Sequence, residues 1–170
     1  MRQQRNQEPE RNETLRLWTY TTAVKAVPYV HSVVRSIREH WLEGQSAQRR
    51  IDRLDAQPGR PDRHTLIRRA ETVQEFEQGY TAFEEALEEL RELSAVCLDP
   101  TAGLALLPFG QGEDLAWFVF DLFAPRGLVA WRLHSDPLEA RRPLLQDPAA
   151  ALPAYGGSLL EVSHAQDYSP

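Results

Sequence analysis

Apolar residues recur at intervals of three and four positions along a first long stretch of the chain. This spacing places them on one face of a helix that we predict over residues 22–54. Thr19 and Thr21 are its candidate N-caps. Pro28 lies too deep for the first turn, so we expect it to kink this helix or to mark where regular hydrogen bonding begins. The apolar positions are Val27, Val30, Val34, Ile37, Trp41, Ile51 and Leu54.

A second stretch, from residue 62 or 65 to residue 94, repeats the helical spacing. Its apolar residues occupy two heptad positions, as in a coiled coil: Leu66, Val73, Tyr80 and Leu87 at one, and Phe76, Phe83 and Leu90 at the other. Two prolines and a glycine within residues 57–62 predict a turn between the helices. The result is a long antiparallel helical hairpin with little core of its own. We expect it to pack on the rest of the chain or to dimerise into a four-helix bundle.

After Pro100 the pattern changes to short apolar runs separated by turns that contain glycine. The runs at residues 104–109, 115–123 and 128–134 predict three antiparallel strands, which residues 96–98 could join. In the central run, the period of two places Trp117, Val119, Asp121 and Phe123 on one face and Phe118, Phe120 and Leu122 on the other. We expect one face to pack on the helices, and the other on the C-terminal tail or on a second subunit.

The predicted fold class is α+β: a long antiparallel helical hairpin over residues 19–95, followed by a small three-stranded antiparallel sheet within residues 96–134. Together they form a single domain over residues 14–144. We expect residues 1–13 to be a polar arm and residues 145–170 to be an extended C-terminal tail, because the tail is rich in proline and lacks periodicity.

The composition is typical of a soluble globular protein, because 42% of the 170 residues are hydrophobic and 26% are charged. The single cysteine, Cys97, excludes an internal disulfide. The N-terminal residues include no apolar stretch, and no window is apolar enough to span a bilayer. We therefore expect a cytoplasmic protein without membrane attachment.

The net charge of −6 disfavours a general nucleic-acid binder, but the charge is unevenly distributed. Residues 1–70 carry 14 Lys and Arg against 8 Asp and Glu, a net charge of +6, whereas residues 71–170 carry 5 against 17, a net charge of −12. Either a basic and an acidic helix pack together, or the basic half meets an acidic partner. The turn between the helices is the most basic region, with Arg49, Arg50, Arg53, Arg60, Arg63, Arg68 and Arg69 as candidates for contacting an acidic partner or phosphate.

Two segments resemble the signatures of a bacterial family, the domain of unknown function 2203. The segment from Trp18 to Val30 is similar to the family's opening signature, with matches at Thr19, Ala23 and Pro28. A second similarity begins at Gly103 and includes Leu104, Pro108, Trp117, Trp131, Arg141 and Pro143. The resemblance covers residues 16–144 and implies the same order, a helical hairpin and then a sheet.

The chain departs from that family at several polar positions. Leu106 stands where the family has Asp, and Arg132 and Leu133 stand where it has His-Glu. Asp136, Pro137 and Ala140 replace its glycines before the final arginine. A metal or catalytic site built from those family residues would be missing here. The resemblance therefore implies a fold and no activity.

Candidate chemistry is sparse. None of the five histidines forms a His-x-x-x-His or Glu-x-x-His pair, so the sequence predicts no metal and no cofactor. Cys97 follows an acidic helix and lies among apolar residues, which favours a small buried hydrophobe over a nucleophile. Asp121 is a carboxylate in an apolar strand and needs a partner, for which Arg132 or Arg141 are the candidates.

Three functions stay open, and a non-enzymatic role is favoured over an enzyme. The first is an interaction or assembly module that forms a homodimer through the heptad faces of the hairpin. The second is a ligand-binding protein or small enzyme with a pocket between helices and sheet, near Asp121, Trp131, Arg132, His134 and Arg141. The third is a binder of an acidic partner or nucleic acid through the basic turn.

Overall fold

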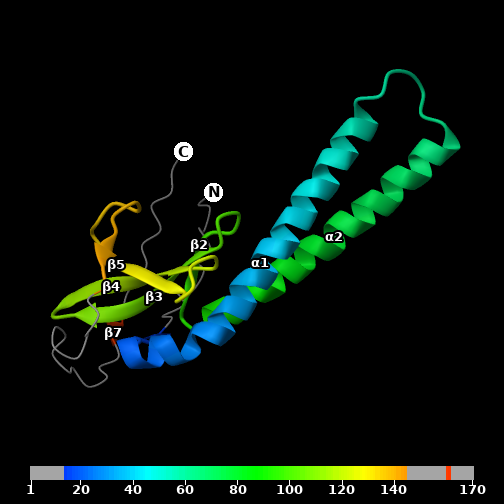
Figure 1. Cartoon of the computed structure of the whole chain (residues 1–170). Helices are drawn as coiled ribbons and strands as arrows, with labels where there is room; N and C mark the ends of the chain where they lie inside the picture. The colour runs from blue at the N-terminus through cyan, green and yellow to red at the C-terminus, as the bar shows by residue number, and fades with distance from the viewer. Residues whose placement is uncertain (1–13, 145–159, 162–170) are drawn as a thin grey trace, which may run out of the picture.

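The computed structural model describes residues 14–144 and 160–161 and contains two long helices and a five-stranded antiparallel sheet (Figure 1). The predicted α+β class is confirmed, whereas the predicted sheet of three strands has two strands too few. The predicted polar arm lies outside the described residues, and so does the predicted C-terminal tail except for residues 160–161.

The first helix, α1 (Tyr20–Asp55), begins at the first of the two candidate caps. The Thr19 hydroxyl accepts a hydrogen bond from the backbone N–H of Thr22 at 3.2 Å, and the Thr22 hydroxyl accepts one from the backbone N–H of Thr19 at 3.0 Å. This reciprocal arrangement satisfies two N–H groups that an uncapped helix end leaves without partners. Thr21 lies inside the helix and is not its cap.

Pro28 lies in the interior of α1, where it lacks the N–H that would bond the carbonyl four residues earlier. The helix continues on both sides of it, so the expectation that regular hydrogen bonding begins there is wrong. Figure 1 shows that the first turns of α1 run along the sheet and that the remainder heads away from it. Because an interior proline is a common cause of such a bend, this change of direction agrees with the predicted kink.

The second helix, α2 (Arg63–Glu92), follows the loop 56–62 and returns toward the sheet (Figure 1). Its N-cap is Asp62, whose carboxylate accepts a hydrogen bond from the N–H three residues later at 2.7 Å. Two ion pairs join the helices near the loop: Arg69 with Asp55 at 2.6 Å, and Arg50 with Glu75 at 2.8 Å. Asp55, nearer the end of α1, pairs with the residue nearer the start of α2, so the two helices run in opposite directions.

The sheet has the strand order β2-β3-β4-β5-β6, and every neighbouring pair is antiparallel. The strands are β2 (Val96–Asp99), β3 (Leu104–Gln111), β4 (Asp114–Asp121), β5 (Leu128–Leu133) and β6 (Arg142–Pro143). The three central strands correspond to the three apolar runs. The edge strand β2 includes residues 96–98, which the sequence offered as a possible addition to the sheet, whereas β6 has two residues and is too short for a period of two to reveal it. A separate pair joins β1 (Thr14–Leu15) to β7 (Leu160–Glu161).

The core lies where the sheet meets the base of the helix pair. One face of the sheet, including Phe118 and Phe120, packs against the first half of α1 and the end of α2. The opposite face carries a smaller cluster: Leu106, Trp117, Val119 and Ala130. The predicted alternation is thus correct for residues 117–120, whereas Phe123 lies beyond the end of β4. That the tail or a second subunit covers the opposite face stays a prediction.

The outer ends of α1 and α2, next to their loop, contact only each other among the described residues (Figure 1). Few side chains are buried there, namely Ala47, Ile51 and Thr72. A Cβ added at Gly79 would lie 3.8 Å from the backbone nitrogen of Gly44, so the two backbones approach closely at mid-length. Small residues permit this approach, but they leave the outer part of the pair with little apolar surface inside it.

The turn between β4 and β5 offers a stability test. Gly127 has a φ of +69°, and a Cβ there would lie 2.8 Å from both Phe120 and Val27. We expect Gly127→Ala to lower the free energy of unfolding by about 2–4 kcal/mol, the sum of backbone strain and overpacking. Urea unfolding followed by circular dichroism measures this change.

Gly112→Ala is the matched control, because Gly112 has a φ of +65° and nothing within 4 Å of an added Cβ. It should cost only about 1 kcal/mol, from the backbone alone. Equal losses for the two variants would contradict the packing of the β4–β5 turn against α1.

Candidate functional site

The five predicted pocket residues do not converge on one site. Asp121 ends β4, where its carboxylate accepts a hydrogen bond from the backbone N–H of Phe123 at 2.8 Å. The prediction that Asp121 forms an ion pair is wrong, because neither Arg132 nor Arg141 bonds to its carboxylate. Arg141 instead donates to the carbonyl oxygens of residues 138 and 140, at 2.7 and 2.8 Å. Asp121 therefore shapes a turn and does not neutralise an arginine.

Arg132 is the buried charge of this region, with a side chain only 4% exposed. Its guanidinium donates to the carbonyl oxygens of His134, at 3.3 Å, and Asp136. Its Nε is buried and has no acceptor within the described ranges. On the same face of the sheet, the indole N–H of Trp117 bonds to Nδ1 of His134 at 3.1 Å. These bonds hold the chain that follows β5.

The sequence reasoning missed the ion pair of this region, which joins Asp136 to Arg142. Two bonds connect their side chains, at 2.9 and 3.1 Å, and the same carboxylate accepts the backbone N–H of Leu133 at 2.8 Å. The bonds from Arg142 and then Leu133 hold the pKa of Asp136 below its usual value. The guanidinium of Arg142 also lies 5.0 Å from the ring of Trp131. The cluster clamps β6 onto β5, which is a structural role.

Cys97 lies partly buried in β2, and burial is the main reason that the pKa of its thiol is raised to about 11, with Asp99 adding to the effect. Such a thiol stays protonated at neutral pH, which disfavours nucleophilic chemistry. The described part of the chain contains no group of three or more His, Cys, Asp or Glu side chains arranged to hold a metal ion.

The basic turn lies at the outer end of the helix pair, and all seven of its arginines are exposed. Arg50 and Arg69 form the ion pairs that join the helices. The other five have no ion pair with a described residue: Arg49, Arg53, Arg60, Arg63 and Arg68. A small cavity of about 380 Å³ opens beside Arg53 and Arg68. The turn therefore keeps most of its cationic groups accessible.

Four aromatic side chains form a stripe along one side of the helix pair; we call Trp41, Phe76, Tyr80 and Phe83 the aromatic stripe. Successive ring centroids lie 5.3, 6.4 and 6.3 Å apart from Trp41 to Phe76. Tyr80 is 49% exposed, and the other three are half-buried. Leu66 and Val73 share the heptad position of Tyr80 and extend the stripe toward the loop. At its inner end the stripe meets the rest of the chain: Phe83 packs against the core, and Trp41 donates a hydrogen bond to Thr101 at 3.1 Å.

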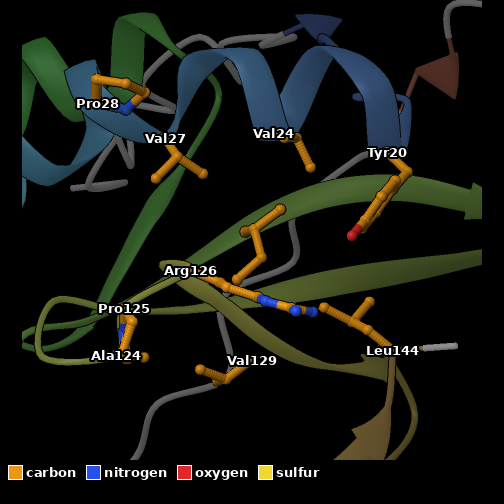
Figure 2. Close-up of a pocket in the computed structure, with 10 residues that line it drawn as sticks. Tyr20, Val24, Val27, Pro28, Ala124, Pro125, Arg126, Val129 and Leu144 are labelled. Carbon is orange, nitrogen blue, oxygen red and sulfur yellow. The ribbon is translucent and has the colours of Figure 1, made fainter. Parts of the chain in front are cut away.

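A groove of about 800 Å³ lies between the first turns of α1 and the turn and strand that follow β4 (Figure 2). α1 contributes Tyr20, Val24, Val27 and Pro28; the other side consists of Ala124, Pro125, Arg126, Leu128, Val129 and Leu144. None of the five predicted pocket residues lines it. A pocket between helices and sheet was expected, but its lining was not, because only the fold brings residues 20–28 to residues 124–129.

Compared with models of protein families, with curated proteins and with solved structures, the chain matches none. No helix in the described ranges has the length and apolar character needed to cross a membrane. The function must therefore be argued from the aromatic stripe, the basic turn and the groove themselves.

The raised pKa of Cys97 predicts slow alkylation. At pH 7–8 only about one thiol in a thousand or fewer is ionised, so iodoacetamide should react more than about 100-fold slower than with a free cysteine. The rate should rise about tenfold per pH unit up to roughly pH 10, since the thiolate is the reacting species. Mass spectrometry gives the rate, and protein unfolded in urea is the control. A rate that levels off below about pH 9 would show that the thiol is not protected in this way.

Proposed function

We propose that this protein is a non-enzymatic assembly module that self-associates through its helical hairpin. The observation that carries the proposal is the aromatic stripe, in which Tyr80 is 49% exposed and the other three aromatic side chains are half-buried beside it. Contiguous exposed apolar surface of this kind is typical of interaction sites. Aromatic residues are also the side chains that contribute most to binding energy at protein interfaces.

The weak interior of the helix pair supports the same proposal. Its outer part buries mainly Ala47, Ile51 and Thr72, which together offer little apolar area. Burying a half-exposed aromatic side chain in a four-helix bundle would add about 1–2 kcal/mol for each residue. A symmetric dimer would bury the stripe of both copies, so this contribution counts twice and offsets part of the entropic cost of association.

The charges favour an antiparallel arrangement of the two copies. Residues 49–69 carry seven Arg and three Asp, a net charge of +4, whereas residues 71–92 carry eight Glu and one Arg, a net charge of −7. Centred on Tyr80, an antiparallel pair brings the basic turn of each copy to the acidic base of the other. A parallel pair would instead place like charges side by side, which is unfavourable.

The proposal retains two expectations from the sequence. One is that the chain is a divergent member of the bacterial family named above; the resemblance at Thr19 and Pro28 supports it, since these residues cap and bend α1. The other is a cytoplasmic location, which is in keeping with a single, unpaired cysteine.

A second candidate function is the binding of an acidic partner, other than a second copy of the chain, through the basic turn. It is favoured by the five arginines that have no ion pair with a described residue, because guanidinium groups suit phosphate and carboxylate. A chain that stays monomeric and binds heparin in a salt-dependent way would support this candidate over self-association.

Tyr80→Glu tests self-association directly. A charge at the centre of the stripe is expected to cost about 3 kcal/mol or more, since each dimer contains the change twice, and to weaken dimerisation by more than about 100-fold. Light scattering coupled to size-exclusion chromatography, at about 50 µM chain, measures the molar mass of the particle and so separates monomer from dimer.

Ile67→Glu is the matched control, because Ile67 is 46% exposed on the same helix but faces away from the stripe. It should leave the dimer intact. A wild-type chain that is monomeric at this concentration, or a control that dissociates as readily as the test variant, would refute the proposal.

Ionic strength tests the orientation of the two copies. In an antiparallel dimer, raising the salt from about 50 to 500 mM screens the attraction between turn and base, so the dimer should weaken. A parallel dimer should strengthen, because repulsion is screened instead. Sedimentation equilibrium at both salt concentrations separates these results, and a dimer that tightens with salt would exclude the antiparallel arrangement.

A further inference from the structure

The groove between α1 and β5 has a polar end and an aliphatic remainder. Figure 2 shows the Tyr20 hydroxyl and the Arg126 guanidinium both directed into the space between the helix and the strand, close to Leu144. Neither group has a hydrogen-bond or ion-pair partner among the residues that the structure describes. The groove therefore presents one cation and one hydroxyl donor together at one end.

The start of α1 adds to the positive potential at this end. Tyr20 is the first residue of a helix of 36 residues, and the first turn contains no acidic side chain. The positive end of the helix dipole thus has no carboxylate of its own helix beside it. Three features, namely the guanidinium, the hydroxyl and the helix terminus, favour the same kind of group: an anion that accepts hydrogen bonds.

The rest of the groove is aliphatic. Val24 and Val27 lie on the helix side, Val129 lies opposite them, and two prolines lie toward the other end (Figure 2). Apart from Tyr20, the lining contains no aromatic side chain on which a planar ring could stack. Val24 and Val129 are 44% and 39% exposed, so both keep apolar surface that a ligand could cover. The volume of about 800 Å³ is in the range of small-molecule sites.

The turn that carries Arg126 is held by several hydrogen bonds. Asp121 binds it at three points: its carboxylate accepts the N–H of Phe123, its N–H donates to the carbonyl of Gly127 at 2.8 Å, and its carbonyl accepts the N–H of Ala124 at 3.2 Å. Gly127 lets the turn approach Val27 of α1, where a Cβ would collide. Asp121 therefore holds the backbone of the turn from which the Arg126 side chain extends.

We propose that this groove binds an aliphatic monocarboxylate, with the carboxylate at Arg126 and Tyr20 and the hydrocarbon chain along Val24, Val27 and Val129. This ligand class fits both parts of the groove: its anionic head matches the cationic end, and its alkyl chain matches the aliphatic wall. The site is separate from the aromatic stripe, so this inference does not depend on self-association.

Titration of the full chain with decanoate, followed by calorimetry and by amide chemical shifts, tests the inference. Saturable binding below about 1 mM is expected, with shifts confined to the start of α1 and to residues 124–129. Octanoate should bind about 4- to 16-fold more weakly, since two methylene groups are lost. Decanol should also bind at least about tenfold more weakly, because it lacks the charge that Arg126 recognises.

Arg126→Ala should weaken decanoate at least about tenfold and leave decanol unchanged. Arg141→Ala is the matched control, an exposed arginine outside the groove that should have no effect. Both side chains are exposed, so both variants should fold, and circular dichroism checks this. The absence of saturable decanoate binding, equal affinity in the Arg126→Ala variant, or shifts that map to the aromatic stripe would each overturn the proposal.

Discussion

The contact between one face of the sheet and the first half of α1 is the interaction on which the rest of the structure depends. Phe118 stacks on Phe109 with ring centroids 4.0 Å apart, and Tyr20 meets the same ring edge-on at 6.0 Å. Val30, Val34 and Ile37 complete this layer without exposed surface. Because these residues anchor α1 at one end, the remainder of the helix pair can extend from the sheet with few buried side chains of its own.

The helices could be predicted from the sequence because their signals are local. The threonine and aspartate caps, the proline-rich loop and the apolar period located both helices to within two residues at most ends, since capping and periodicity act over a few positions. The central strands were equally readable. Of the two edge strands, β2 was anticipated only as a possible addition over residues 96–98, and β6 was missed, because it contains two residues and only its pairing with β5 defines it. Pairing of this kind depends on the whole sheet.

The candidate sites were harder to predict than the strands, because they too depend on contacts between distant parts of the chain. Asp121 was expected to need an arginine, but a carboxylate at a strand end can bond backbone N–H groups of its own turn instead. The partner of Arg142 proved to be Asp136, six residues away across a turn whose path the sequence did not reveal. Nothing in the sequence singles out Arg126 among 18 arginines. Only the fold brings it into one groove with Tyr20, which lies more than a hundred residues earlier. By contrast, the aromatic stripe follows directly from the heptad positions.

The length of α2 has a consequence for any assembly built on this hairpin. Thirty helical residues span about 45 Å, and the bend in α1 keeps the sheet at one end of that span. Two copies joined antiparallel would therefore hold their sheets at opposite ends of a stiff rod. The helix pair would then act as a spacer that sets a constant separation between two identical surfaces, and one heptad added to both helices would lengthen this spacer by about 10 Å.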